Sequence, residues 1–132
     1  MGQPAAKQGD QIVATDIHII MIPSASGSVP TPLPHPFMGL LSESLSSDVK
    51  IMGRFAATVG SKARNSPPHI PQGGPFQMPP SNEGTILRGS GTVLINGKPA
   101  ARNGDQAQTC ADPIPNTGAQ VLVPGGTVMI GG

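Results

Sequence analysis

The chain has 132 residues, a formal net charge of +1 and only 11% charged residues. A charge this small and balanced excludes an electrostatic nucleic-acid surface, so we expect no nucleic-acid partner. Gly and Pro make up about a quarter of the chain, and Trp and Tyr are absent. A single domain with so few large rings has a thin core, which needs a disulfide, a metal or a partner to stabilise it. Because there is one cysteine, a metal or a partner remains.

The N-terminal sequence lacks the basic and then apolar pattern of a signal peptide. The longest apolar runs, 17–22 and 121–123, are too short to cross a bilayer. We therefore expect a protein that is cytoplasmic when made, has no signal peptide and makes no stable membrane insertion.

The first part of the chain opens on a box, Pro4-Ala5-Ala6-Lys7, and continues into an isoleucine-rich run at 17–22. Isoleucine runs favour strand over helix, and Pro23 is expected to end this strand. The alternating prolines of residues 23–36 predict an extended, polyproline-like loop. The apolar stretch 37–41 is compatible with one helical turn or with a loop plug.

Similar boxes recur at 55–58 and, most completely, at Pro99-Ala100-Ala101-Arg102. A short strand and a Gly turn precede each of these two boxes, and a matching strand at 126–132 closes the chain. Pro/Gly loops are predicted at 65–84 and 111–120. Since the first box lacks a strand and the last strand lacks a box, we expect the two chain ends to meet and complete a third unit.

The repeat predicts an all-β fold, a small conical stack of short strands and hairpins with a pseudo-threefold internal repeat and long Pro/Gly loops, stapled by a metal. One domain is expected over residues 1–132, with repeat units near 121–132 plus 1–22, 48–70 and 90–113. Six β-branched residues are predicted to point inward around the pseudo-threefold axis: Val49, Val93, Val128, Ile51, Ile95 and Ile130.

Metal ligands are suggested by the repeat register. His18 lies eight residues after Asp10, and His69 lies eight residues after Ser61, which occupies the matching place. With Cys110 from the third unit and His35 from the first Pro-rich segment, they form a set of three imidazoles and one thiol. Such a set suits one tetrahedral zinc ion per chain, and four protein ligands would make that zinc structural.

An alternative role for Cys110 is that of a nucleophile, with a histidine as its base, in a metal- or thiol-dependent enzyme. No sequence signature surrounds Cys110, and no helix N-terminus is expected beside it to lower its pKa. Alkylation would separate the two readings, because a zinc-bound thiolate is protected from the reagent.

The boxes at 4–7, 55–58 and 99–102, with the strand and Asn-Gly turn at 92–97, resemble the PAAR and PAAR-like family over nearly the whole chain. The resemblance implies a β-rich cone that carries zinc near its apex, held by three His and one Cys. Carried over, these are His18, His35, His69 and Cys110. The middle box departs from the pattern, since it ends in Thr58 and has Ser61 where the others have Asp.

The resemblance also implies a non-enzymatic function. PAAR proteins cap the trimeric β-helical spike of contractile injection machines, such as type VI secretion systems, extracellular injection particles or phage-like tailocins. The expected partner is a trimeric spike protein of the valine-glycine-repeat or phage-tail type, with one cap per trimer. A tip of this kind sharpens the spike for membrane puncturing and can tether effector cargo, and it is delivered outside the cell or into the target.

Overall fold

The computed structural model describes residues 2–132, and these fold into strands, turns and loops. The strands are β1 (Gln3–Pro4), β2 (Gln11–Ser24), β3 (Gly27–Glu43), β4 (Lys50–Ile51), β5 (Arg54–Phe55), β6 (Lys62–Asn65), β7 (Glu83–Ile86), β8 (Leu94–Ile95), β9 (Lys98–Pro99), β10 (Gln106–Thr109), β11 (Asn116–Leu122) and β12 (Met129–Ile130). The prediction of an all-β fold is therefore confirmed. No helix among the described residues has the length and apolar character needed to span a membrane.

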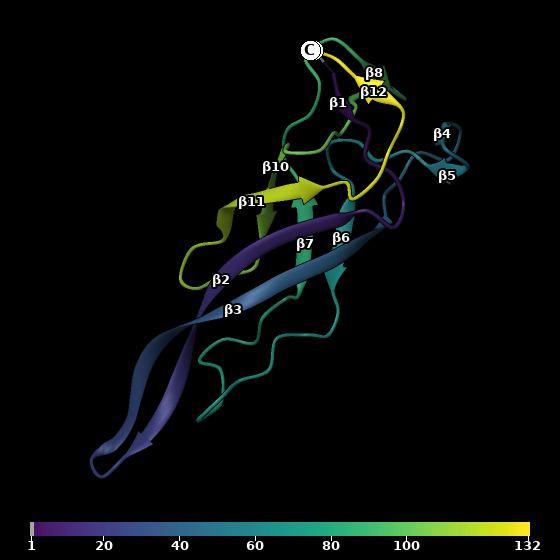
Figure 1. The fold of residues 1–132 in the computed structure, drawn as a ribbon. Coiled ribbons are helices and arrows are strands. Elements are labelled where there is room, and N and C mark those ends of the chain that lie inside the picture. The colour runs from purple at the N-terminus through teal and green to yellow at the C-terminus, as the bar shows by residue number, and fades with distance from the viewer. Residues whose placement is uncertain (1) are drawn as a thin grey trace.

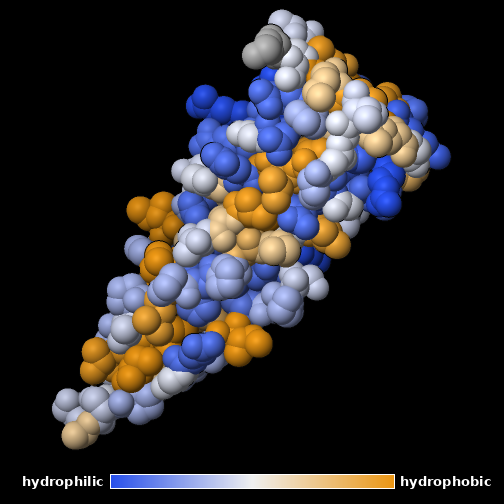
Figure 2. Space-filling view, in the orientation of Figure 1, coloured by the Kyte–Doolittle hydropathy of each residue, from blue (hydrophilic) through white to orange (hydrophobic). Residues whose placement is uncertain are grey.

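Six strands form one closed antiparallel sheet in the order β10-β11-β2-β3-β6-β7, and β7 returns to pair with β10. β2 and β3 are much longer than the other strands, and their hairpin projects beyond the sheet (Figure 1). The molecule consequently tapers from a broad end, where β1, β4, β5, β8 and β12 lie, to the narrow end formed by this hairpin (Figures 1 and 2).

Three two-stranded antiparallel units at the broad end repeat one register: the hairpins β4–β5 and β8–β9, and the pair of β12 with β1. The pairs Ile51↔Arg54, Ile95↔Lys98 and Ile130↔Gln3 occupy equivalent places. In the first two hairpins both turn residues have positive φ, which suits the tight turn that matches strand twist. The third unit pairs β12 with β1, so strands from opposite ends of the described chain meet as predicted from the sequence.

The Ala-Ala boxes close a ring of backbone hydrogen bonds around the pseudo-threefold axis. The N–H of Ala6 donates to the carbonyl of Ala101 (2.9 Å), that of Ala101 to Ala57 (3.1 Å), and that of Ala57 to Ala6 (3.0 Å). All three side chains are fully buried, and a larger side chain would separate the backbones. The ring explains why small residues stand at these three places.

The turn after each box is held in the same way in all three units. A side-chain oxygen accepts the backbone N–H of the residue three positions earlier, in the pairs Lys7–Asp10 (3.0 Å), Thr58–Ser61 (3.0 Å) and Arg102–Asp105 (2.7 Å). Two of these pairs are also ion pairs, and the Asp105 carboxylate raises the pKa of Arg102 by hydrogen bonding. The Ser61 departure is thus conservative, because a hydroxyl oxygen accepts the same bond.

Two apolar clusters lie on either side of the alanine ring. The cluster at the broad end contains Ile51, Ile95 and Ile130, each 7% exposed, against the first alanines of the boxes. The larger cluster lies inside the closed sheet and is built around Phe37, Ile12 and Leu41. Because small residues complete both clusters, the core is as thin as the composition predicts.

The prediction that six β-branched residues point inward is wrong for three of them. The three isoleucines are buried as predicted, whereas Val93 and Val128 are 36% and 40% exposed and Val49 is only partly buried. In each unit the first alanine of the box donates its N–H to the carbonyl of the equivalent valine. These valines therefore contribute their backbone to the unit, while their side chains lie near the surface of the broad end.

The loop predicted over residues 23–36 is also wrong, because β2 continues to Ser24 and β3 runs through this stretch and through 37–41. Prolines 30, 32, 34 and 36 occupy alternate positions of β3, opposite Met21, Ile19, Ile17 and Thr15. A strand tolerates proline where its nitrogen faces away from the neighbouring strand. Alternating proline therefore marks an edge here, and strand pairing overrides the polyproline preference. Likewise β11 begins at Asn116, inside the turn predicted over 111–120.

Candidate metal centre

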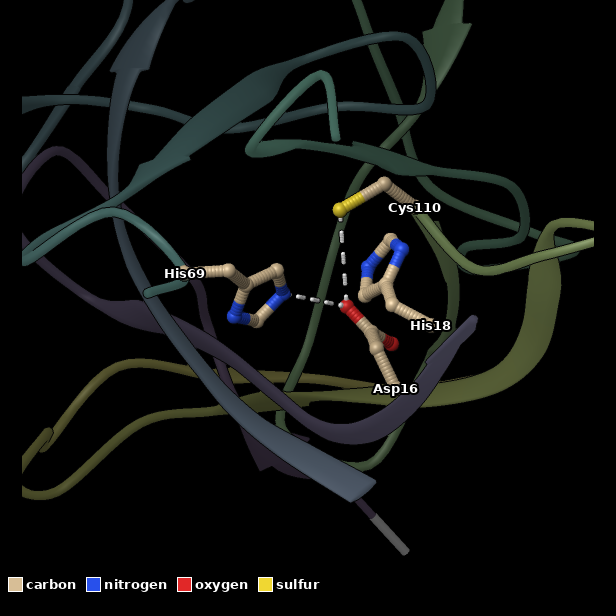
Figure 3. A group of neighbouring side chains, drawn as sticks. All are labelled: Asp16, His18, His69 and Cys110. Carbon is tan, nitrogen blue, oxygen red and sulfur yellow. Dashed lines mark hydrogen bonds and ion pairs between the residues drawn. The ribbon is translucent and has the colours of Figure 1, made fainter. Parts of the chain in front are cut away.

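Four potential metal ligands meet where the projecting hairpin leaves the closed sheet. Asp16 and His18 alternate along β2 and so share its inner face, His69 comes from the loop after β6, and Cys110 follows β10. One ligand atom from each residue lies within 4.8 Å of those of the other three. Figure 3 shows these four side chains converging on one point.

His35 lies beside this group, on β3 directly opposite Asp16. Its ring centroid is 5.4 Å from that of His18 and 5.5 Å from that of His69, and the latter two rings are 4.9 Å apart. All four residues predicted from the sequence thus lie in one neighbourhood. The ligand role of His35 stays a prediction, because the four converging ligand atoms are those of Asp16, His18, His69 and Cys110.

His18 has the arrangement of a metal ligand. Its Nδ1 lies 3.2 Å from the Asp112 carboxylate, which only accepts, so Nδ1 carries a hydrogen and, in the neutral imidazole, the lone pair lies on Nε2. His18 is 1% exposed, and its Nε2 is buried without a hydrogen-bond partner among residues 2–132. A buried acceptor without a partner is costly. A metal ion at Nε2 would remove that cost, and the outer carboxylate would hold the ring in place.

His35 is oriented in the same sense. Its Nδ1 lies 2.9 Å from the Leu33 carbonyl and therefore donates to it. The lone pair again falls on Nε2, in the tautomer that binds a metal through that atom. His35 and His18 thus both donate from Nδ1, His35 to a backbone carbonyl and His18 to a carboxylate.

His69 is held differently. The N–H of Met38 donates to Asn65 Oδ1 (2.9 Å), so the Asn65 amide presents its Nδ2 to His69 Nδ1 (3.1 Å). His69 Nδ1 therefore accepts, and its Nε2–H donates to Asp16 at 3.1 Å. Burial lowers the pKa of His69 despite the neighbouring carboxylate, which agrees with a neutral ring. Binding a metal through Nε2 would exchange the Asp16 bond for the metal and require the Asn65 amide to turn.

Asp16 was not predicted from the sequence. Its carboxylate is fully buried and accepts hydrogen bonds from Thr109, Asn116 and His69, with the Cys110 Sγ at 3.6 Å. These donors fix the carboxylate in place, where its oxygens are available as metal ligands. The predicted strand begins at Ile17 and so leaves Asp16 out, whereas β2 begins at Gln11 and places Asp16 two residues before His18, on the same face.

Cys110 is half-buried at one wall of a cavity of about 270 Å³ that His18 and Asp112 also line. Burial, followed by the charge of Asp16, raises the pKa of the Cys110 thiol. Without a metal the group is thus a thiol at neutral pH, whereas a cation at the centre would favour the thiolate.

The donor chemistry fits a metal of the zinc type. The four converging ligand atoms comprise two imidazole nitrogens, one sulfur and one carboxylate oxygen, and zinc accepts each of these. The buried lone pair of His18 is the observation that supports a metal here independently of the residue types. This buried Asp/His/His/Cys group is therefore a candidate metal centre.

Comparison with known proteins agrees with this geometry. Residues 77–132 match the family model of the PAAR motif, and no curated protein matches the chain. The matched region contains the most complete box and Cys110, and the cyclic hydrogen bonds relate it to the two earlier boxes. The PAAR motif in residues 77–132, together with the two structurally equivalent boxes that precede it, supports a PAAR-repeat protein.

Proposed function

We propose that this protein caps the blunt end of a trimeric β-helical spike, as the tip of a contractile injection system. The PAAR motif is typical of spike-tip proteins of these machines. The observation that supports the capping role is the pseudo-threefold broad end, where three two-stranded units repeat one register. A monomer with this symmetry can make three equivalent contacts with a trimer, so one cap binds one spike.

The broad end also offers apolar surface for docking. Five apolar side chains of its hairpins and of the residues beside them are substantially exposed: Met52 (51%), Val93 (36%), Leu94 (62%), Val128 (40%) and Met129 (57%). Leu94 and Met129 occupy equivalent positions of β8 and β12, as Val93 and Val128 do just before these strands. Clustered exposed apolar residues mark interaction sites. In this proposal the narrow end then points away from the spike and leads it into a target envelope.

The metal in this proposal is one structural zinc per chain, close to the base of the projecting hairpin. The zinc would join β2, the loop after β6 and the segment after β10, which ties the hairpin to the closed sheet. The same tip could carry an effector as cargo, which co-purification of a third protein with the complex would reveal.

The test is assembly with a trimeric spike of the valine-glycine-repeat or phage-tail type. Native mass spectrometry of the mixture is expected to show one cap on three spike chains. Leu94→Asp or Met129→Asp should abolish the complex, while Ile114→Asp, at a residue that is 74% exposed outside the broad-end hairpins, should leave it intact. Another stoichiometry, or a complex that still forms with both Leu94→Asp and Met129→Asp, would contradict the proposal.

A second candidate is a thiol enzyme based on Cys110. The specific observation in its favour is that His18 stands between Cys110 and Asp112, with Nδ1 on the carboxylate and a free Nε2, as in a cysteine-histidine-aspartate constellation. The raised pKa of the thiol is unfavourable for a nucleophile. Alkylation of the zinc-loaded protein separates the two candidates, because a metal-bound thiolate is protected and a catalytic one reacts.

A further inference from the structure

The narrow end of the molecule is free of ionised side chains. Residues 17–42, which form most of the β2–β3 hairpin, contain no Asp, Glu, Lys or Arg, and neither do residues 65–82. This second stretch packs on the hairpin, since the N–H of Met21 donates to Pro75 and that of Gln77 to Ile19, both at 2.8 Å. Three charged residues adjoin this surface: Asp16 is buried, Asp112 has a carboxylate that is only 10% exposed, and Arg64 lies opposite Leu40 at the base of the hairpin.

The outer face of this hairpin is apolar. β3 alternates between buried and exposed positions, and its exposed positions from 30 to 40 hold four prolines, Met38 (53%) and Leu40 (49%). Ile17 lies opposite Pro34 and is 40% exposed, and Val29, near the end of the hairpin, is 48% exposed. Figure 2 shows apolar residues along the tapering half of the surface.

The outer edge of β3 cannot add a further strand. The four alternating prolines hold the positions whose nitrogens face away from β2, and proline has no N–H. The intervening residues direct their N–H groups toward β2. The stretch from residue 30 to 36 therefore has no outward donor, and the outer edge of β2 is covered at Ile19 and Met21 by residues 75–77. Strand addition along residues 30–36 of β3, or along Ile19 and Met21 of β2, is thus excluded.

An uncharged, apolar surface without outward N–H donors suits the boundary of a lipid bilayer. The hairpin is convex and narrow (Figures 1 and 2), so a protein partner would need a deep matching groove, whereas a bilayer conforms to it. The outward carbonyls of the prolines still need water, which excludes the hydrocarbon centre and limits contact to the hydrated interface. The eight residues from Ile17 to Ser24 extend about 23 Å, less than the ~30 Å of hydrocarbon.

We propose that the uncharged face of the β2–β3 hairpin makes direct, reversible contact with the interfacial region of a phospholipid bilayer. The inference rests on the proposed function, in which this end leads the spike. The inference adds that the side chains of the hairpin themselves bind lipid, in addition to the mechanical force that drives the spike through the membrane. Since the hairpin carries no charge, the contact is insensitive to salt and needs no anionic lipid.

The test is flotation of the zinc-loaded full chain with zwitterionic phosphatidylcholine vesicles. The wild type is expected to float equally at low and high salt. Val29→Asp and Ile17→Asp, both at exposed positions, should reduce the partition coefficient about tenfold, because a carboxylate is costly in the membrane. Leu94→Asp places the same charge at the broad end and should float like the wild type.

A reporter tryptophan gives an independent readout, because the chain has no Trp of its own. With vesicles, the emission of Ala25→Trp in the hairpin turn should shift to the blue, while that of Met52→Trp at the broad end should not. The proposal is overturned if the wild type stays unbound, if salt releases it, or if Leu94→Asp weakens flotation as much as Val29→Asp.

The two proposals fail separately. Loss of spike binding in Leu94→Asp together with normal flotation supports both proposals. A wild type that floats but does not bind a spike trimer contradicts only the capping role. A wild type that caps a trimer but does not float contradicts only the lipid contact.

Discussion

Replacing His18 by Ala tests whether the buried lone pair of its Nε2 is a metal ligand. If the proposed zinc binds at this site, zinc at one hundred times its dissociation constant is expected to stabilise the wild-type fold by about 2.7 kcal/mol. For a chain of this size that corresponds to roughly 10 °C in melting temperature. In His18→Ala the ligand is absent, and the zinc-dependent increase should fall to a few degrees or less. In chelator, the melting temperatures of His18→Ala and the wild type should differ much less. The variant loses the packing of the ring, but it also loses the ~1–3 kcal/mol cost of an unpaired buried nitrogen.

The assay is thermal unfolding by circular dichroism, with elemental analysis for metal per chain, in chelator and then with excess zinc. Ile17→Ala is the matched control, because Ile17 adjoins His18 on β2 but lies on the opposite, exposed face of the strand. The control should keep the full zinc-dependent increase and about one zinc per chain. An equal increase in His18→Ala and the wild type would refute the assignment of His18 Nε2 as a ligand.

Three further changes have expected outcomes. Because burial raises the pKa of Cys110, the alkylation rate of the chelated protein should keep rising at pH values where the rate for an exposed thiol has levelled off. Zinc should suppress the alkylation. A rate that levels off at the pH of an exposed thiol would contradict the burial argument. Asp112→Ala should weaken zinc binding 10- to 100-fold in a chelator competition, whereas Asp112→Asn, which keeps an acceptor for His18 Nδ1, should weaken it less. Lys7→Thr should cost about 3–5 kcal/mol in urea unfolding, because it leaves Asp10 buried and unpaired. Adding Asp10→Ser, which copies the neutral pair of the second unit, should recover most of that loss; no recovery would contradict the equivalence of the units.

The repeat was predictable because each unit contains a pair of alanines, and small residues are needed where backbones approach closely. Three Ala-Ala boxes, one complete and two degraded, imply close backbone approach at three equivalent places, and the structure has a hydrogen-bonded ring there. The meeting of the last strand with the first segment follows from the same count of units. The exposure of Val93 and Val128 did not follow, because a two-residue strand gives too little alternation to show which face is buried.

The long hairpin could not be predicted because its prolines argue locally for a loop. Only the pairing with β2, which residues far along the chain stabilise, decides that the stretch is an edge strand. The candidate site was partly predictable for a similar reason. Repeat register pointed to His18 and His69, whereas the role of Asp16 depends on donors from β10 and β11 that no spacing reveals.

The alanine ring has a consequence for the way in which the chain folds. Each box completes its hydrogen bonds only with boxes from the other two units, and β1 pairs with β12 at the far end of the described chain. No unit can therefore satisfy its backbone alone, and contacts between sequence-distant segments must form together, which makes folding slow. During synthesis, residues 3–4 can pair only after residues 129–130 have left the ribosome, so the third unit forms last. The same dependence makes unfolding of the ring all-or-none, so a load applied to one hairpin is shared by all three units.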